Sequence, residues 1–323
     1  MLETFTIAGI LNIEFEEEIN EFLLEEINLK ITNKVELFKS RISDEATSKI
    51  IGLNEKNFII ENKNTLFRDF KFEDTTFETF DPNINLKKFL VITEFYCQSL
   101  WLIKDNSVQF ELAHMIYKNK QYKTIHSNFW NSCYSTSIGK IEKTVFTKDE
   151  IIESVDILKL VLSCNFNDKK IENEAIILTS DSTRLSRAFY FLKSARNTRD
   201  IGTKISIYCS VLESLFSVSN TELRHRLSES ISFFIADIYE ERIIIYKHLQ
   251  TAYDIRSSVV HGDGLQSRFL KNESINLINT AKETDNIIRK CLVKIMQNTD
   301  LFDLFTKGKK EEISNYLQNI IFK

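Results

Sequence analysis

Two residues near the end of one amphipathic segment are of the types that cleave a phosphodiester. Arg256 carries a guanidinium, whose fixed fork of donors matches phosphate oxygens. His261 follows five residues later, and an imidazole both accepts and donates protons near neutral pH. Cleavage of a phosphodiester requires proton transfers and stabilisation of the charge that develops on phosphorus. Arg256 and His261 are therefore the candidate catalytic pair.

Arg256 interrupts an apolar stripe. The preceding inward positions of a helix predicted to begin at Glu240 are Ile245, Leu249 and Ala252. The next inward position is Arg256, where burial without an anionic partner would be costly. A purely structural interpretation pairs Arg256 with Asp254 or Glu241, or lets its head reach solvent.

The residues after His261 predict where this helix ends. Gly262 and Gly264 are two of only seven glycines in the chain, and Gly262 suits the left-handed residue that terminates a helix. A continuous helix would separate positions 256 and 261 by about 140°. We expect the helix to end at His261, so that the imidazole swings back toward Arg256. The alternative is that His261 only caps the helix dipole.

Residues 181–323 have a helical period throughout. Predicted helices run from Asp181 or Ser182 to Arg196, from 200 to 217, from Thr221, from Glu240, and from 273 to 297; the last aligns Ile278, Ala281, Ile288, Leu292 and Ile295. Five amphipathic helices with short connections predict a helical bundle.

Residues 1–147 instead alternate in β-branched and aromatic residues between turns rich in Asn and Asp, such as 81–83. This pattern predicts a β-rich antiparallel domain, with 16–31 as either a short helix or an acidic strand pair. Residues 148–180 are predicted as a helix followed by an irregular connector. The fold class is therefore α+β, with a β-rich domain before an all-α bundle.

Charge and composition limit the partners. The net charge is −4 over 323 residues, but residues 1–180 contribute −8 and residues 181–323 contribute +4, so a polyanion should meet the C-terminal half. The start lacks a signal peptide's basic residues, and no apolar run approaches ~18 residues. We expect a cytoplasmic protein without a membrane partner. Five scattered cysteines and the absence of glycine-rich loops, CxxC and HExxH predict neither metal nor cofactor.

Three blocks in the C-terminal half resemble HEPN domains of the Apea-like group. They are YCSVLESLFS at 208–217, LRHRLSESI at 223–231 and YDIRSSVVHG at 253–262. The resemblance implies a HEPN helical fold, a homodimer through the motif-bearing helices, and metal-independent endoribonuclease activity at a composite site. It also implies a role in bacterial anti-phage defence, as an RNA-cleaving toxin of the abortive-infection kind that responds to a phage-derived trigger at the N-terminal domain.

Other residues are secondary candidates. Arg224 and Arg226 flank a histidine and are candidate RNA contacts, although a solvated helix face explains them equally well. Glu213 is expected to pair with an arginine inside the bundle. Ser257 stands where many ribonuclease members of the family have Asn, Asp or His; serine can still bond a phosphate or orient the histidine. This departure keeps a second hypothesis, a catalytically inactive HEPN module that binds a protein or nucleic acid.

Overall fold

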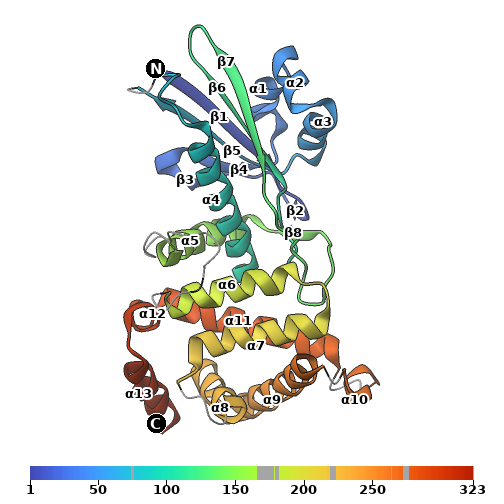
Figure 1. Ribbon diagram of the computed structural model, residues 1–323, viewed down its shortest axis with the longest axis vertical. Coiled ribbons are helices and arrows are strands. Elements are labelled where there is room, and N and C mark those ends of the chain that lie inside the picture. The colour runs from blue at the N-terminus through green and yellow to red at the C-terminus, as the bar shows by residue number, and fades with distance from the viewer. Residues whose placement is uncertain are drawn as a thin grey trace. The chain divides into compact units, whose positions relative to one another are not determined.

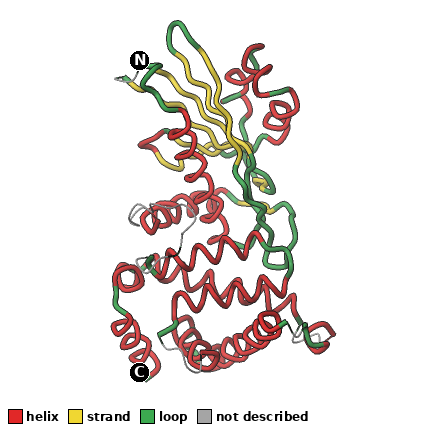
Figure 2. Tube along the Cα trace, viewed as in Figure 1, coloured by secondary structure: helices red, strands yellow, loops and turns green. Residues whose placement is uncertain are grey.

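The structure is a computed structural model that describes residues 1–73, 76–165, 178, 182–218, 223–262, 264–271 and 276–322. Strands belong to the N-terminal part and helices dominate the rest (Figure 1; Figure 2), which confirms the α+β class. The chain forms two compact units. Unit 1 comprises Met1–Tyr134 and Ile141–Lys159, and unit 2 comprises Ser135–Lys140 and Leu160–Lys323. From the sequence, we predicted domain boundaries after residues 147 and 180.

Unit 1 is built on an antiparallel sheet of six strands in the order β3-β4-β5-β1-β6-β7. A separate pair joins β2 and β8 in parallel. The strands are β1 Leu2–Gly9, β2 Ile13–Phe15, β3 Asn20–Leu24, β4 Leu29–Thr32, β5 Thr65–Phe72, β6 Leu112–Lys118, β7 Lys123–Phe129 and β8 Thr144–Phe146. β3 and β4 flank a short 3-10 turn, so of the two interpretations of residues 16–31 the strand pair is correct.

The prediction that residues 1–147 are β-rich missed four helices in this region. These are α1 Lys39–Ile42, α2 Glu45–Ile51, α3 Leu53–Asn62 and α4 Pro82–Ile103. Asp81, expected in a turn, is the N-cap of α4, where its side chain accepts hydrogen bonds from the backbone N–H groups of Asn83 and Ile84. Twelve of the residues in α4 are buried, most of them from Phe89 to the end of the helix, so the helical period is hidden over that part.

The helices α1 to α3 cover one face of the sheet. Phe38, Ile42 and Ile59 from this helical layer pack with Phe5 and Ile7 of β1 in a single apolar cluster. Alternate residues of each strand point to this face, because the side-chain period of a strand is two. The layer leaves one end of the face open, which is where the charged residues of β1, β5 and β6 lie.

Unit 2 consists mainly of helices. They are α6 Arg184–Asn197, α7 Ile201–Phe216, α8 Leu223–Ile235, α9 Tyr239–His261, α10 Ser267–Lys271, α11 Leu277–Gln297, α12 Thr299–Lys307 and α13 Lys310–Ile321, while α5 Lys148–Asn165 crosses the boundary of the two units. No helix in the described part of the chain combines the length and the hydropathy needed to cross a bilayer.

The helix predictions in unit 2 need correction at their ends. The N-cap of α6 is Thr183, not Asp181 or Ser182, and α11 begins after Asn276 rather than at 273. Ile278, predicted to face inward, is 46% exposed. The helices α12 and α13 lie in the segment predicted to be helical, but they were not among the five helices counted there. The expected start at Thr221 and most of the connector at 163–179 lie outside the described residues.

Candidate functional site

The helix α9 carries the predicted catalytic pair and packs against α7, α8 and α11. It ends at His261, and Gly262 follows with φ of +74°. The N–H of Gly262 bonds to the carbonyls of Ser258 and Val259, which satisfies acceptors that a helix end leaves open. The prediction that Gly262 terminates this helix is confirmed.

Arg256 pairs across the bundle with Glu213 of α7. Arg256 Nε lies 3.3 Å from Glu213 Oε1, and Nη2 donates to Oε2 at 3.4 Å. The two side chains are 32% and 22% exposed, so the pair is mostly shielded from solvent. The structural interpretation had named Asp254 or Glu241 as the partner, and that was wrong. The expectation that Glu213 pairs with an arginine is confirmed.

The surroundings of this pair are largely shielded from solvent. Burial raises the pKa of the Glu213 carboxyl above its ordinary value, although Arg256 pulls it in the opposite direction. Next to it, Tyr253 is 6% exposed and its hydroxyl makes no hydrogen bond. Burial also raises the pKa values of Tyr253 and Cys209, which keeps both neutral at ordinary pH. Glu213 is thus the acidic group facing Arg256 from α7.

His261 and Ser257 lie on the outside of α9, and both are exposed. Within the described residues, no hydrogen bond or ion pair joins His261 to Arg256, so the expected approach of the imidazole to the guanidinium is not seen in one chain. The mostly shielded guanidinium of Arg256 and the exposed imidazole of His261 therefore lie apart from each other, on the last turns of the same helix.

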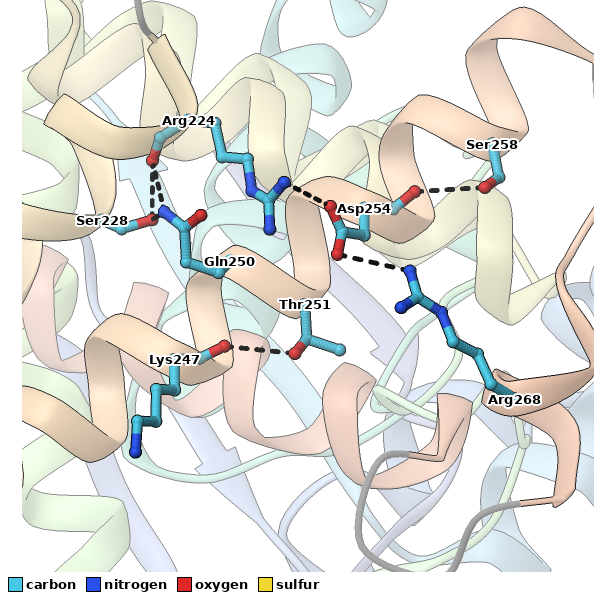
Figure 3. A network of polar contacts seen from close by, with 8 residues as sticks. All are labelled: Arg224, Ser228, Lys247, Gln250, Thr251, Asp254, Ser258 and Arg268. Carbon is cyan, nitrogen blue, oxygen red and sulfur yellow. Dashed lines mark hydrogen bonds and ion pairs between the residues drawn. The ribbon is translucent and has the colours of Figure 1, made fainter.

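A second set of ion pairs lies on the opposite side of α9, where Figure 3 shows Asp254 between two arginines. Arg224 Nη1 of α8 lies 2.7 Å from Asp254 Oδ1, and Arg268 Nη2 of α10 lies 3.5 Å from Oδ2. These arginine side chains are 50% and 56% exposed. Gln250 also donates to the Arg224 carbonyl at 3.1 Å. We call Arg224, Asp254 and Arg268 the outer network.

The remaining candidates divide between this surface and the interior. Arg226 is exposed on the first turns of α8, as is His225, whose ring meets Tyr246 edge-on at 5.7 Å. His248 instead shares a hydrogen bond with Thr284 at 3.2 Å, and burial lowers its pKa. Arg268 was missed from the sequence, because the five residues of α10 carry no periodic signal.

Comparison with protein-family models, curated proteins and solved structures found no match to this chain. Among the described residues, no three histidine, cysteine, aspartate or glutamate side chains gather as they would around a metal ion.

Proposed function

We propose that this protein is a metal-independent endoribonuclease of the HEPN type that acts as an abortive-infection effector against phage. The observation that carries the proposal is the end of α9, where one helix bears the Arg256 guanidinium and, on its last residue before Gly262, the exposed imidazole of His261. The resemblance of three sequence blocks to Apea-like HEPN domains supports the same activity. The defence role and the phage-derived trigger rest on that resemblance alone.

The chemistry assigned to the pair follows from the two side chains. His261 removes the proton of the 2'-hydroxyl, the resulting oxyanion attacks the adjacent phosphorus, and the bond to the 5'-oxygen breaks. The products are a 2',3'-cyclic phosphate and a 5'-hydroxyl. Arg256 stabilises the negative charge that develops on the phosphate oxygens. A homodimer supplies two of each residue, so one histidine acts as base while the other protonates the leaving oxygen.

The arginines around α9 suit a path for the RNA backbone. Arg224 and Arg268 share one carboxylate, that of Asp254, so the outer network has an excess of positive charge. Arg226 is exposed on the neighbouring α8. Phosphate contacts of this kind position an RNA without reading its sequence.

The test compares four full-length proteins on single-stranded RNA in the presence of EDTA. Wild type should cleave, while His261→Ala and Arg256→Ala should each lose about a hundredfold or more in rate, as expected when a proton-transfer or charge-stabilising group is removed. His225→Ala, an exposed histidine of the neighbouring helix, is the matched control and should retain the wild-type rate. Equal cleavage by all four proteins, or loss of wild-type cleavage on chelation, would overturn the proposal.

The ion pair itself favours the second candidate, a catalytically inactive HEPN module. Glu213 engages the Nε and Nη2 edge of Arg256, one of the two-donor edges that a phosphate would use, and Ser257 adds no basic group beside it. Growth on expression separates the two functions. A ribonuclease should arrest growth in a manner that depends on His261, whereas a binding module should leave growth unchanged.

A further inference from the structure

Unit 1 contains a hollow of about 680 Å³ at the open end of the face that α1 to α3 cover. Its lining comes from β1, β5, β6, β7 and the segment around α1. Figure 1 shows these strands beside α1 and α2 in the N-terminal part of the chain. The volume is within the range of roughly 300–1,000 Å³ that small-molecule sites occupy.

Strand register places a row of charges across the mouth of this hollow. Glu3 of β1 is paired with Lys71 of β5 on one side and with Lys118 of β6 on the other. Lys118 is in turn paired with Lys123 of β7. Residues paired across antiparallel strands share a face, so three lysines and one glutamate stand side by side on four adjacent strands.

The ion pairs in this row leave an excess of positive charge. Glu3 is shared by two lysines, with Oε1 3.6 Å from Lys71 Nζ and Oε2 3.3 Å from Lys118 Nζ. Lys123 Nζ lies 2.8 Å from Oδ2 of Asp44. The lysine side chains are 66%, 45% and 37% exposed in the order 71, 118, 123. An exposed and loosely held pair such as Lys71–Glu3 contributes little to stability, so an incoming anion can replace this carboxylate without large cost.

Behind the row, the hollow has an apolar floor with a polar edge. Phe5 and Ile116 are nearly fully buried beneath it. The guanidinium of Arg41 lies over the Phe5 ring, 5.6 Å from its centroid, and 3.2 Å from Oδ1 of Asp69. Asn28 donates to the carbonyl of Asp69 at 3.0 Å. A planar group would find the Arg41 guanidinium to stack on, hydrogen-bonding groups at the edge and a small apolar surface at the base.

We propose that this hollow binds a phosphorylated small molecule of nucleotide size. The phosphates contact Lys71, Lys118 and Lys123, and the ring system lies on the apolar floor beside Arg41. Metal binding is disfavoured because each lining carboxylate already faces a cation: Glu3 two lysines, Asp44 Lys123, and Asp69 Arg41. The proposal concerns unit 1 and does not depend on the ribonuclease activity assigned to unit 2.

The experiment measures binding of ribonucleoside triphosphates, inorganic triphosphate, unphosphorylated nucleosides and a short single-stranded RNA to the full-length protein by calorimetry. At least one ribonucleoside triphosphate should bind, and the Lys71→Ala/Lys118→Ala double variant should bind it at least tenfold more weakly. Lys143→Ala is the matched control, because this lysine also pairs with a glutamate, Glu14, is 69% exposed and lies outside the hollow. It should change the affinity less than twofold.

Each alternative result overturns a defined part of the proposal. Absence of binding by every triphosphate, or equal binding by the double variant, removes the site. Equal affinity for nucleosides removes phosphate recognition, and equal affinity for inorganic triphosphate removes the ring site. Tighter binding of the RNA to the same lysines replaces the small molecule with a nucleic acid. Far-UV circular dichroism of each variant shows that a loss of binding is not a loss of fold.

Discussion

The two sides of α9 use the same kinds of charged residue in different surroundings. Arg256 turns inward and pairs with Glu213, and both side chains are at least two-thirds buried. Asp254, two residues earlier and so about 200° around the helix, is itself 28% exposed but pairs with Arg224 and Arg268, whose side chains are at least half exposed. Desolvation makes the inner pair costly to break, whereas water screens the outer network. The inner pair should govern stability and the outer network should govern encounters with an anion.

The largest effect on stability is expected from breaking the inner pair. Arg256→Ala should lower the free energy of unfolding by about 2 kcal/mol, below the roughly 3–5 kcal/mol of a fully buried pair, because solvent reaches both side chains. Arg268→Ala should cost about 0.5 kcal/mol or less. Urea unfolding followed by far-UV circular dichroism measures both. The two tryptophans, Trp101 and Trp130, lie in unit 1, so their fluorescence gives an internal reference.

Equal losses for these two arginine variants would remove the distinction between the two sides of α9. A shift of the tryptophan transition as large as that of the dichroism would show that the variant acts on the whole chain rather than on the α7–α9 contact.

The inner pair should also give stability an unusual dependence on pH. Burial raises the pKa of folded Glu213 above the 4.5 of an unperturbed glutamate, so the folded protein holds this proton more tightly than the unfolded chain. This contribution therefore falls as pH rises from 4.5 through the folded pKa. Glu213→Gln should lack this fall when stability is measured across that range.

Asp200, the N-cap of the same helix α7, provides a control of opposite sign. The Thr203 side chain and backbone N–H lower the pKa of Asp200 below 3.8 through hydrogen bonds. Its contribution is present above pH 3.8 and is lost as pH falls through the folded pKa. Asp200→Asn should thus lower stability above pH 3.8 and should lack the loss that this group causes at the acid end. The same slope in wild type and Glu213→Gln between pH 4.5 and neutrality would argue that Glu213 is not shielded.

Gly262 ends α9 directly after His261 and so sets the course of the backbone next to this histidine. Gly262→Ala should cost about 1 kcal/mol, because a side chain is strained at a φ of +74° even though no atom lies within 4 Å of the added Cβ. Gly264 has a φ of +72° and the same free space, so Gly264→Ala carries similar strain without ending the helix. A loss of RNA cleavage confined to Gly262→Ala, in the assay used for His261→Ala, would link the helix end to activity.

The smallest effects are expected in the outer network. Arg224→Ala and Arg268→Ala should each reduce the slope of log affinity for RNA against log salt by about one, the amount for one phosphate contact. Arg242→Ala is the control, because its guanidinium is bonded to the Ala236 carbonyl and lies over the Phe233 ring. If Arg242→Ala changes the salt slope as much as Arg224→Ala and Arg268→Ala do, then these arginines contribute only to the net charge of the protein.

Local sequence signals found the helices of unit 2 better than those of unit 1. Asp200 caps α7 and Gly262 ends α9 through bonds to residues within four positions, and such contacts are legible from sequence. In α4, burial on nearly all sides from Phe89 onward leaves little contrast between faces, so the same reasoning predicted strands. The ends of α6 and α11 depended on which of several neighbouring polar residues became the cap.

The sequence by itself determined the α+β class, the helix that carries Arg256 and His261, and the residue that ends it, because periodicity and capping act within a few residues. It also indicated that Arg256 needs an anionic partner. Only the tertiary structure decided that this partner is Glu213, 43 positions away, and that Asp254 pairs with Arg224 and Arg268. Likewise, strand register alone brings Lys71, Glu3, Lys118 and Lys123 into one row. Such pairings depend on how distant elements pack, which no local pattern encodes.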